Sequence, residues 1–338
     1  LSFDLKKFSI RPYWDFAYVE SRKLSNNEWL EKAEATIEQS VKAHLVSDVP
    51  FGAFLSGGID STLIVDYMSK ILKQRVKTFT IGFKEAKFSE VEHADLVAKQ
   101  LGTEHFCEII EPDALGVLPT LVKHYGEPFG DSSAIPTYYV SKLARAHVPM
   151  VLSGDGGDEA FFGYQSYSKW YDYISYKGVM AYKKPFHPFL ERIHPHRYPP
   201  RNSYQGWIEI NRYLPYSWRK RLWRKDVMDH VRWENSEFEE IFKINDGQPV
   251  PRQAQYCDLK TYLPCDILTK VDRASMVHGL EVRTPLVDTE IWNLVSSMPV
   301  NLNLDLATGS GKRLLKFILR KSYPESFTAR PKQGFSIP

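Results

Sequence analysis

The pattern of apolar and polar positions is most regular between residues 49 and 72. Residues 49–55 form a mainly apolar run, which is typical of a buried strand. Two glycines, Gly57 and Gly58, follow it. Apolar residues then recur on one face of a helix, at Leu63, Ile64, Tyr67, Met68, Ile71 and Leu72. The pattern therefore predicts a strand, a glycine turn and the start of a helix.

The same alternation continues to residue 152. Runs rich in apolar, β-branched and aromatic residues predict strands at 76–83, 104–110 and 148–152. Helical spacing predicts helices that begin near 25 and 89, and others across 115–124 and 133–146. Because strands that alternate with helices pair in parallel, we expect an α/β fold with a doubly wound, mostly parallel sheet. Ligands bind such sheets beyond the carboxyl ends of the strands.

Capping signals mark two of the predicted helices. Ser25 with Glu28, and Ser89 with Glu92, have the spacing of a capping box, in which each side chain bonds a backbone N–H at the helix start. Gly102 stands where a glycine would end the second of these helices.

The glycine turn after the first strand suits an anion. Gly57 and Gly58 allow backbone conformations that a Cβ forbids and let an anion approach closely. Free N–H groups and the positive end of the helix dipole strengthen such a site. Asp60 would repel a bare phosphate, but Mg²⁺ between them resolves this, because it binds through carboxylates and substrate phosphates. The alternative is an ordinary Gly-Gly turn before a helix.

A second glycine-rich turn follows the strand at 148–152. Its residues, 153–159, read Ser-Gly-Asp-Gly-Gly-Asp-Glu and carry three acids. Two parallel strands that both end in such turns would place Asp60 and Asp158 on one rim of the sheet, where they could hold magnesium against a triphosphate. The alternative is a structural turn, because Asp-Gly is common turn chemistry.

Composition excludes some classes of protein. The chain has 338 residues, 43% apolar and 25% charged, which is typical of a globular protein of about two domains. A net charge of +3 excludes nucleic-acid binding through the charge of the whole molecule. Cys107, Cys257 and Cys265 fit no zinc or disulfide pattern, so we expect reduced thiols in a cytoplasmic protein. No apolar run is long enough to cross a membrane.

Residues 183–233 differ in composition from the rest of the chain. They contain twelve Lys or Arg against four Asp or Glu, with interleaved aromatics at Trp207, Tyr213, Tyr216, Trp218 and Trp223. Single-stranded nucleic acid stacks on surfaces of this kind. We favour the alternative of a helical insertion that packs its aromatic rings inward, and we do not expect nucleic acid as a partner. His187, His194 and His196 lack helical i, i+4 spacing, so we expect a loop surface there and not a metal site.

Four motifs in order resemble the synthetase half of the class B asparagine synthetases, which are N-type ATP pyrophosphatases. They are Leu-Ser-Gly-Gly-Ile-Asp-Ser at 55–61, Leu-Ser-Gly-Asp-Gly-Gly-Asp-Glu at 152–159, Glu-Val-Arg-Thr-Pro-Leu-Val-Asp at 281–288 and Lys-Phe-Ile-Leu-Arg at 316–320. Arg-Pro-Tyr-Trp at 11–14 and Arg-Pro-Lys-Gln-Gly-Phe at 330–335 also fit. The resemblance implies the adenine-nucleotide α-hydrolase-like, PP-loop fold with helical additions.

The resemblance also implies roles for single residues. The pyrophosphate portion of ATP would lie on Ser56, Gly57, Gly58, Asp60 and Ser61, and the adenosine against Leu55, Ile81, Ser153 and Gly154. Asp60 and Asp158 would carry Mg²⁺. Lys316 would face the α-phosphate, and Glu281 would be a buried acid near the acceptor carboxylate. Gly-Ser-Gly-Lys at 309–312 has the wrong spacing for a phosphate loop and no hydroxyl after the lysine, so we assign it no role.

The implied reaction makes an amide at the expense of ATP. A carboxylate, aspartate in asparagine synthetases, attacks the α-phosphorus to give an acyl-adenylate and pyrophosphate, and ammonia then displaces AMP. Asp155 stands where these synthetases usually have Glu and where lactam-forming relatives differ. The acceptor therefore stays open, with lactam formation, amidation of cell-surface polysaccharide and tRNA base modification as alternatives. A nucleotide-binding scaffold without enzymatic activity is a further one.

We expect four segments. They are a lead-in at 1–24, an ATP-pyrophosphatase α/β core at 25–180, a basic, aromatic-rich helical insertion at 181–250 and a helical part at 251–338 that completes the active site. The family's glutaminase domain uses an N-terminal cysteine, whereas this chain begins with Leu1. We therefore expect a fragment that receives ammonia free or from a glutaminase domain. A homodimer is one possible assembly.

Overall fold

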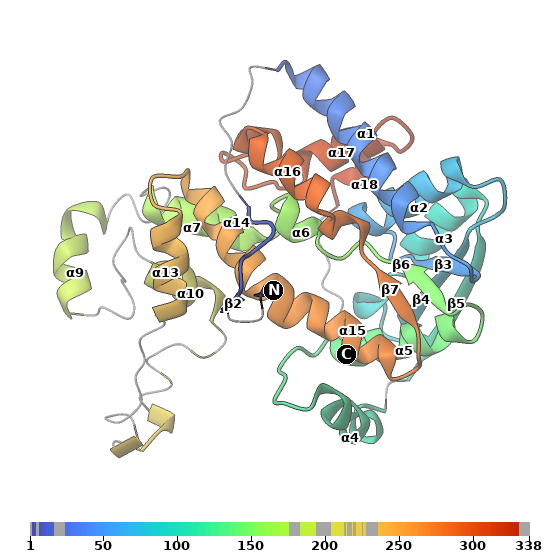
Figure 1. Cartoon of the computed structure of the whole chain (residues 1–338), viewed down its shortest axis with the longest axis horizontal. Helices are drawn as coiled ribbons and strands as arrows, with labels where there is room; N and C mark the ends of the chain where they lie inside the picture. Colours follow the sequence, from blue (N-terminus) through green and yellow to red (C-terminus); the bar gives the residue numbers. More distant parts are fainter. Residues whose placement is uncertain are drawn as a thin grey trace.

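The computed structural model describes the chain except for residues 1, 5, 6, 17–23, 112, 176–182, 194–203, 213, 215–217, 219, 220, 225, 228–235 and 331–338. A five-stranded sheet lies in the right-hand part of Figure 1. The strand order is β5-β4-β3-β6-β7, and every neighbouring pair is parallel. The strands are β3 (Phe51–Phe54), β4 (Lys77–Phe83), β5 (Glu104–Ile110), β6 (Met150–Leu152) and β7 (Glu281–Arg283).

The predicted α/β fold with a parallel sheet is confirmed, but one strand is additional. We expected residues 251–338 to be helical, whereas β7 pairs with β6 and completes one edge of the sheet. β7 has only three residues, and two of them are charged. A strand this short shows neither an apolar run nor an alternating pattern, so its sequence does not reveal it.

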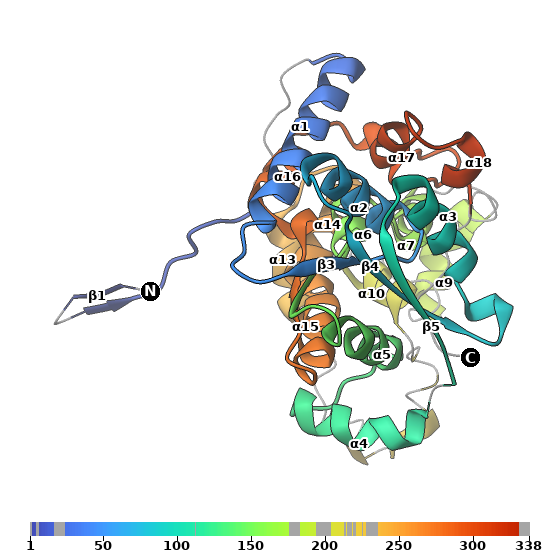
Figure 2. The ribbon, with the colours of Figure 1, turned by 90° about the vertical axis from the view of Figure 1, so that its right-hand side faces the viewer.

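Helices cover both faces of the sheet (Figure 2). On one face lie α1 (Asn26–His44), α2 (Ile59–Ile71), α3 (Val91–Leu101), α16 (Thr289–Ser297) and α17 (Arg313–Leu319); on the other lie α5 (Ala134–Arg145) and α15 (Thr269–Met276). Strand β4 shows the sequence basis, because Phe79, Ile81 and Phe83 are buried in the cluster on the α5 side. The alternate residues Thr78 and Thr80 point to the opposite face and are buried too.

One of the two predicted capping boxes is confirmed. Ser25 Oγ accepts from the Glu28 N–H (3.3 Å), and the Ser25 N–H donates to Glu28 Oε2 (2.7 Å). The box at Ser89 and Glu92 is wrong, because Glu90 is the N-cap of α3 and makes no side-chain cap bond. The helix begins one residue later than predicted, so both side chains are out of register with the orphan N–H groups. Gly102 ends α3 at φ 63°, as predicted.

A second group of helices packs beside the sheet, on the left of Figure 1. It contains α7 (Gln165–Ile174), α9 (His187–Ile193), α10 (Tyr204–Asn211), α13 (Ser236–Ile244) and α14 (Val250–Lys260). Buried aromatic rings join α7 to α10, with Tyr167 stacked on Trp207 at 5.6 Å between ring centroids. Of the aromatics noted at 183–233, Trp207 is thus packed inward as predicted, whereas Trp218 and Trp223 are exposed. Tyr213 and Tyr216 lie outside the described residues, as do His194 and His196.

The remaining elements are one helix of twelve residues, α4, and several short elements. They are β1 (Ser2–Asp4), β2 (Lys7–Ser9), α4 (Ala114–Tyr125), α6 (Gly157–Ala160), α18 (Glu325–Thr328), a π-helical turn at Leu263–Leu268, and 3₁₀ turns at Ala86–Phe88, Lys184–Phe186, Pro285–Val287 and Val300–Leu302. Phe16, in the predicted lead-in, is buried with its ring against Trp292 (5.6 Å), and Asp15 pairs with Lys260 (2.6 Å). The four predicted segments stay a prediction.

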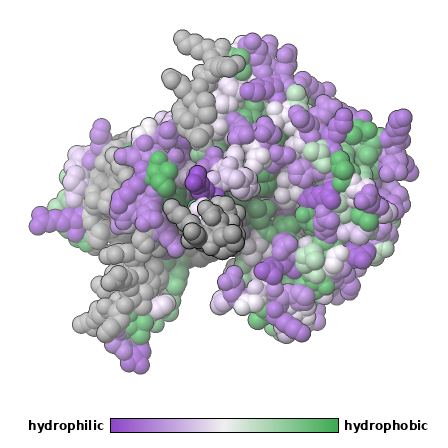
Figure 3. All heavy atoms as spheres, viewed as in Figure 1, coloured by the Kyte–Doolittle hydropathy of each residue, from purple (hydrophilic) through white to green (hydrophobic). Residues whose placement is uncertain are grey.

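On the face shown in Figure 3, hydrophilic residues predominate and hydrophobic ones are scattered in small groups. No helix among the described residues combines the length and the apolar character needed to span a bilayer.

Candidate active site

The two glycine turns meet at the carboxyl edge of the sheet. Their strands, β3 and β6, are direct neighbours. Gly154 in the second turn lies against the first, so that a Cβ there would stand 2.8 Å from the Asp60 carbonyl carbon and from the Ser61 nitrogen. Only glycine permits this approach. The expected common rim is therefore present.

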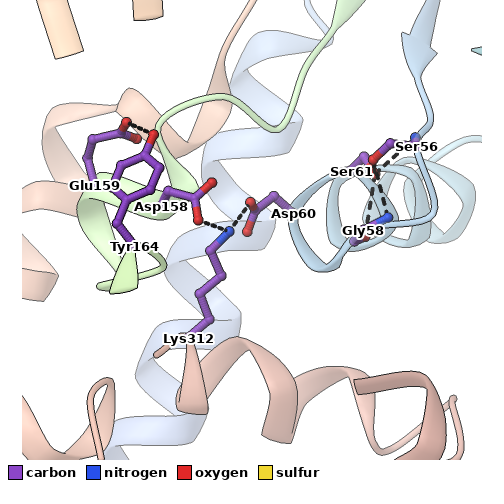
Figure 4. Close-up of polar contacts among 8 residues, drawn as sticks. All are labelled: Ser56, Gly58, Asp60, Ser61, Asp158, Glu159, Tyr164 and Lys312. Atoms are coloured by element: carbon purple, nitrogen blue, oxygen red, sulfur yellow. Dashed lines mark hydrogen bonds and ion pairs between the residues drawn. The ribbon is translucent and has the colours of Figure 1, made fainter. Parts of the chain in front are cut away.

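Hydrogen bonds of two serine hydroxyl groups fix the shape of the first turn (Figure 4). Ser56 Oγ and Ser61 Oγ lie 2.9 Å apart, the Ser56 N–H donates to Ser61 Oγ (3.2 Å), and the Gly58 N–H donates to Ser56 Oγ (3.2 Å). Gly57 adopts φ 72°, where a Cβ would meet the His93 backbone at 2.5 Å. Gly58 is the N-cap of α2 and offers no side chain to its first N–H groups. The start of this helix can therefore receive an anion.

A lysine joins the two turns. The Lys312 ammonium pairs with Asp60 Oδ2 and with Asp158 Oδ1, the second at 2.6 Å (Figure 4). All three side chains are at least four-fifths buried. Burial alone would lower the pKa of Lys312, but the charges of Asp158 and Asp60 and their hydrogen bonds raise it above its ordinary value. Asp60 and Asp158 thus share one cation.

The Lys312 backbone is held in a rare conformation. Lys312 (φ 55°) and Phe162 (φ 56°) are the non-glycine residues with positive φ in the described part of the chain. They are neighbours in space, because the Lys312 N–H donates to the Phe161 carbonyl oxygen (2.8 Å), and a Cβ on Gly311 would overlap the Phe162 carbonyl oxygen. Strained backbones of this kind cluster at functional sites. Here the strain directs the lysine toward the aspartates.

Lys316, the lysine that the resemblance singled out, has a different partner. Its ammonium donates to Ser310 Oγ (2.9 Å). Burial, together with the charges of Lys312 and Arg320, lowers the pKa of Lys316. Both lysines line the same cavity. The sequence signal for Lys312 was the Gly-Ser-Gly-Lys stretch at 309–312, to which we assigned no role because its spacing does not match that of a phosphate loop.

A cavity of about 720 Å³ opens between the turns. Almost all predicted site residues line it: Leu55, Ser56, Gly57, Gly58, Asp60, Ser61, Ile81, Ser153, Gly154, Asp155, Asp158 and Lys316. Asp155 accepts a hydrogen bond from Ser153 Oγ (2.5 Å). Residues 331–335 of the closing motif lie outside the described residues, but Arg330 lines the cavity.

The prediction that Glu281 is a buried acid is wrong. Its side chain is 55% exposed, pairs with Arg283 (2.6 Å), and is not on the cavity wall. Glu281 pairs with Met150 at the first position of strand β6, so it lies at the amino end of the sheet, opposite the turns. The motif-based prediction did not account for β7, which sets this register.

A different acidic residue is buried in the wall of the cavity. Glu159 is 1% exposed, and Tyr164 Oη donates to its Oε1 (2.5 Å; Figure 4). Burial, helped by the charge of Asp158, raises the pKa of Glu159 to about 7. The sequence placed Glu159 in the second turn, but nothing in its spacing marked it as buried.

Charged residues from other elements complete the wall. Lys270 of α15 pairs with Asp131 (3.3 Å), which precedes α5, and both side chains are mostly buried. Arg330 donates to the Gly57 carbonyl oxygen (2.8 Å). Burial raises the pKa of Glu90 to about 7 against the opposing charge of Arg330. The cavity therefore has a phosphate-type turn, a pair of acids and several buried cations on one surface.

Comparison with known proteins agrees with this geometry. The family model described as asparagine synthase matches residues 32–338. The chain is 31% identical to asparagine synthetase 1 (glutamine-hydrolysing) of Bacillus subtilis, over 98% of the chain and 54% of the relative. It is 32% identical to a protein of Mycobacterium tuberculosis provisionally named as a glutamine-hydrolysing asparagine synthetase, over 91% and 48%.

Asparagine synthetase B of Escherichia coli is 30% identical over 49% of the chain and 32% of the relative. The chain spans about half the length of the first two relatives. The matched region contains both glycine turns, the lysine between their acids and the helices on either face of the sheet. The chain therefore belongs to the asparagine synthase family.

Proposed function

We propose that the chain is the synthetase part of an ATP-dependent amide ligase that adenylates a carboxylate, most simply aspartate, and passes the acyl group to ammonia. The single observation that supports this best is the contact of two glycine turns whose acids, Asp60 and Asp158, share one cation. The cavity at that point, about 720 Å³, has the size of a small-molecule site. The named relatives are asparagine synthetases.

The cavity offers ATP one orientation. Its phosphates would lie on residues 56–61, where N–H groups and the dipole of α2 attract anions. The adenosine would lie next to Leu55, Ile81, Ser153 and Gly154, which all line the cavity. The side chains of Leu55 and Ile81 are nearly fully buried, so their backbone groups would face the adenosine.

Asp60 and Asp158 fit a magnesium ion. Both carboxylates already pair with one ammonium, so a cation between them is compatible with their positions. Within the described residues, no group of three or more His, Cys, Asp or Glu side chains could hold a metal. Two carboxylates with substrate phosphate oxygens are a usual ligand set for Mg²⁺. Bound there, the ion would neutralise phosphate charge as pyrophosphate leaves.

The remaining chemistry is positioning and charge stabilisation. The acceptor carboxylate would attack the α-phosphorus, and the bond to the pyrophosphate oxygen would break. Lys316 lines the cavity and donates to Ser310 Oγ; it would release Ser310 to meet the charge that develops on the α-phosphate. Ammonia would then attack the acyl carbon, lose a proton, and expel AMP with the electrons of the C–O bond.

Asp155 and Lys270 are the residues that we expect to contact the acceptor. Lys270 is a mostly buried cation of the cavity wall, held by Asp131 at 3.3 Å. Such a cation suits an acceptor with a second carboxylate, and aspartate is one. Asp155 would contact the acceptor from the second turn. Lactam formation, polysaccharide amidation and tRNA base modification keep the same ATP chemistry with another acceptor.

The conditions of the reaction follow from the same proposal. Cys107, Cys257 and Cys265 are free thiols, as a cytoplasmic location requires. Ammonia would come free or from a glutaminase domain, and a homodimer is compatible with these roles.

The test is ATP–pyrophosphate exchange with a panel of acceptors. We expect exchange that requires Mg²⁺ and aspartate, and asparagine formation when ammonium is added. Asp60→Asn should abolish exchange, whereas Asp48→Asn, at an exposed position before β3, should not. Release of ADP and phosphate would exclude adenylation. Exchange with an oligosaccharide, a lactam precursor or tRNA, and not with aspartate, would replace the acceptor and keep the chemistry.

A further inference from the structure

Lys312 lies between the two carboxylates to which the proposed function assigns a divalent cation. Its ammonium pairs with Asp60 Oδ2 and Asp158 Oδ1, one oxygen from each turn. Asp60 and Asp158 are only 15% and 19% exposed, so water screens their mutual repulsion poorly. The lysine therefore supplies the positive charge that these two carboxylates require when no nucleotide is present.

The backbone of Lys312 is fixed by its neighbours. Its N–H is bound to Phe161, and Gly311 before it leaves no room for a side chain against Phe162. A Cβ on Gly163 would overlap both Asp158 and the Lys312 side chain. The Lys312 backbone is therefore fixed, and any departure of the ammonium from the aspartates has to come from the side chain alone.

We propose that Lys312 is a place-holding cation, so that the metal enters the site of Asp60 and Asp158 only together with a triphosphate. Bare Mg²⁺ would have to displace a buried ammonium that is held by both carboxylates. A metal–triphosphate complex brings phosphate oxygens that receive the ammonium, so the exchange leaves no buried charge unpaired. The inference rests on the metal site of the proposed function.

The consequence is that metal and nucleotide bind cooperatively. Their coupling free energy should be larger than the direct interaction between the two ligands alone would give. Reciprocity requires that each ligand raise the affinity for the other by the same factor. Removing the ammonium should abolish the part of this coupling that comes from displacement. It should also open the two carboxylates to a metal on its own.

The experiment measures binding of Mn²⁺, by its electron paramagnetic resonance signal, to the full chain with and without a non-hydrolysable ATP analogue. Without nucleotide, we expect Lys312→Met to bind Mn²⁺ at least about tenfold more tightly than wild type. Lys70→Met, which removes an ion-paired lysine outside the cavity, should bind it as weakly as wild type. Asp60→Asn added to Lys312→Met should remove the gain.

The outcomes separate this inference from the function on which it rests. If Lys312→Met binds nucleotide-free Mn²⁺ no more tightly than wild type, while both bind it with the analogue, the place-holding role is wrong and the metal site stands. If Asp60→Asn binds Mn²⁺ with the analogue as tightly as wild type, the metal site itself is wrong. Lys312→Gln serves where Lys312→Met fails to fold. Wild type alone must also bind Mn²⁺ at least about tenfold more tightly with the analogue, or the inference fails.

Discussion

Arg330 donates a hydrogen bond of 2.8 Å to the carbonyl oxygen of Gly57, which lies 273 positions earlier in the chain. The same guanidinium donates through Nε to the Phe327 carbonyl oxygen (3.0 Å) and lies over the Phe327 ring. One side chain thus connects the C-terminal part of the chain to the first glycine turn. The shape of that turn depends on a residue far outside it.

We predict that Arg330→Ala and Arg330→Lys both weaken ATP binding about three- to tenfold, the effect of one lost hydrogen bond. Lysine keeps the charge, but it lacks the planar guanidinium that donates to the carbonyl oxygens of Gly57 and Phe327 at the same time. Calorimetric titration with an ATP analogue measures the affinity. Arg75→Ala is the control, since Arg75 also donates to two backbone carbonyl oxygens, those of Gly102 (2.8 Å) and Thr103 (2.7 Å), but outside the cavity, and the variant should bind the analogue normally. Unchanged affinity in Arg330→Ala would rule out this role.

Glu90 should make stability depend on pH. Burial raises its pKa from 4.5 to about 7, against the opposing charge of Arg330. Between pH 4.5 and 7 the folded protein keeps a proton on Glu90 that the unfolded chain has lost. The free energy of unfolding therefore decreases as the pH rises through this range. Relative to Glu90→Gln, wild type should therefore lose about 1–3 kcal/mol of unfolding free energy between pH 5 and pH 8.

Urea unfolding at both pH values measures this difference. Glu92→Gln, two positions along the chain and exposed, should follow wild type. A parallel pH profile for Glu90→Gln and wild type would show that Glu90 titrates normally.

The contact between the two turns should tolerate no side chain at Gly154. An added Cβ would meet the Asp60 and Ser61 backbone at 2.8 Å, and relief requires the turns to separate. We expect Gly154→Ala to lose about 1–3 kcal/mol of stability and most ATP affinity. Gly130→Ala is the matched control, because nothing lies within 4 Å of a Cβ at that glycine. Thermal unfolding and analogue binding, measured together, test both effects; normal binding by Gly154→Ala would argue against a site between the turns.

Sequence reasoning succeeded where a local pattern and a global rule agreed. The strand, turn and helix around Gly57 and Gly58 were visible as apolar spacing, and the rule for parallel sheets then brought Asp60 and Asp158 to one rim. Asp60 and Asp158 are far apart in the sequence, and the adjacent parallel strands β3 and β6 bring them together.

It failed where position depends on tertiary packing alone. Glu281 was assigned a buried role from its motif, but the register of the short strand β7 places it at the exposed end. Lys312 was assigned no role, because its contact with both aspartates depends on a left-handed backbone that local composition does not encode. The burial of Glu159 depends on Tyr164 and on the helices behind it, and a single sequence does not report such packing.

The two capping boxes test the same limit on a local scale. At Ser25 both reciprocal hydrogen bonds form, so Ser25→Ala should destabilise the chain by about 1 kcal/mol through the lost cap of α1. Ser89 has the same spacing to an acid but lies one residue before the N-cap of α3, so Ser89→Ala should change stability by less than about 0.5 kcal/mol. Equilibrium unfolding of both variants in urea measures the contrast. Equal losses would mean that spacing in the sequence, and not the start of the helix, decides where a cap forms.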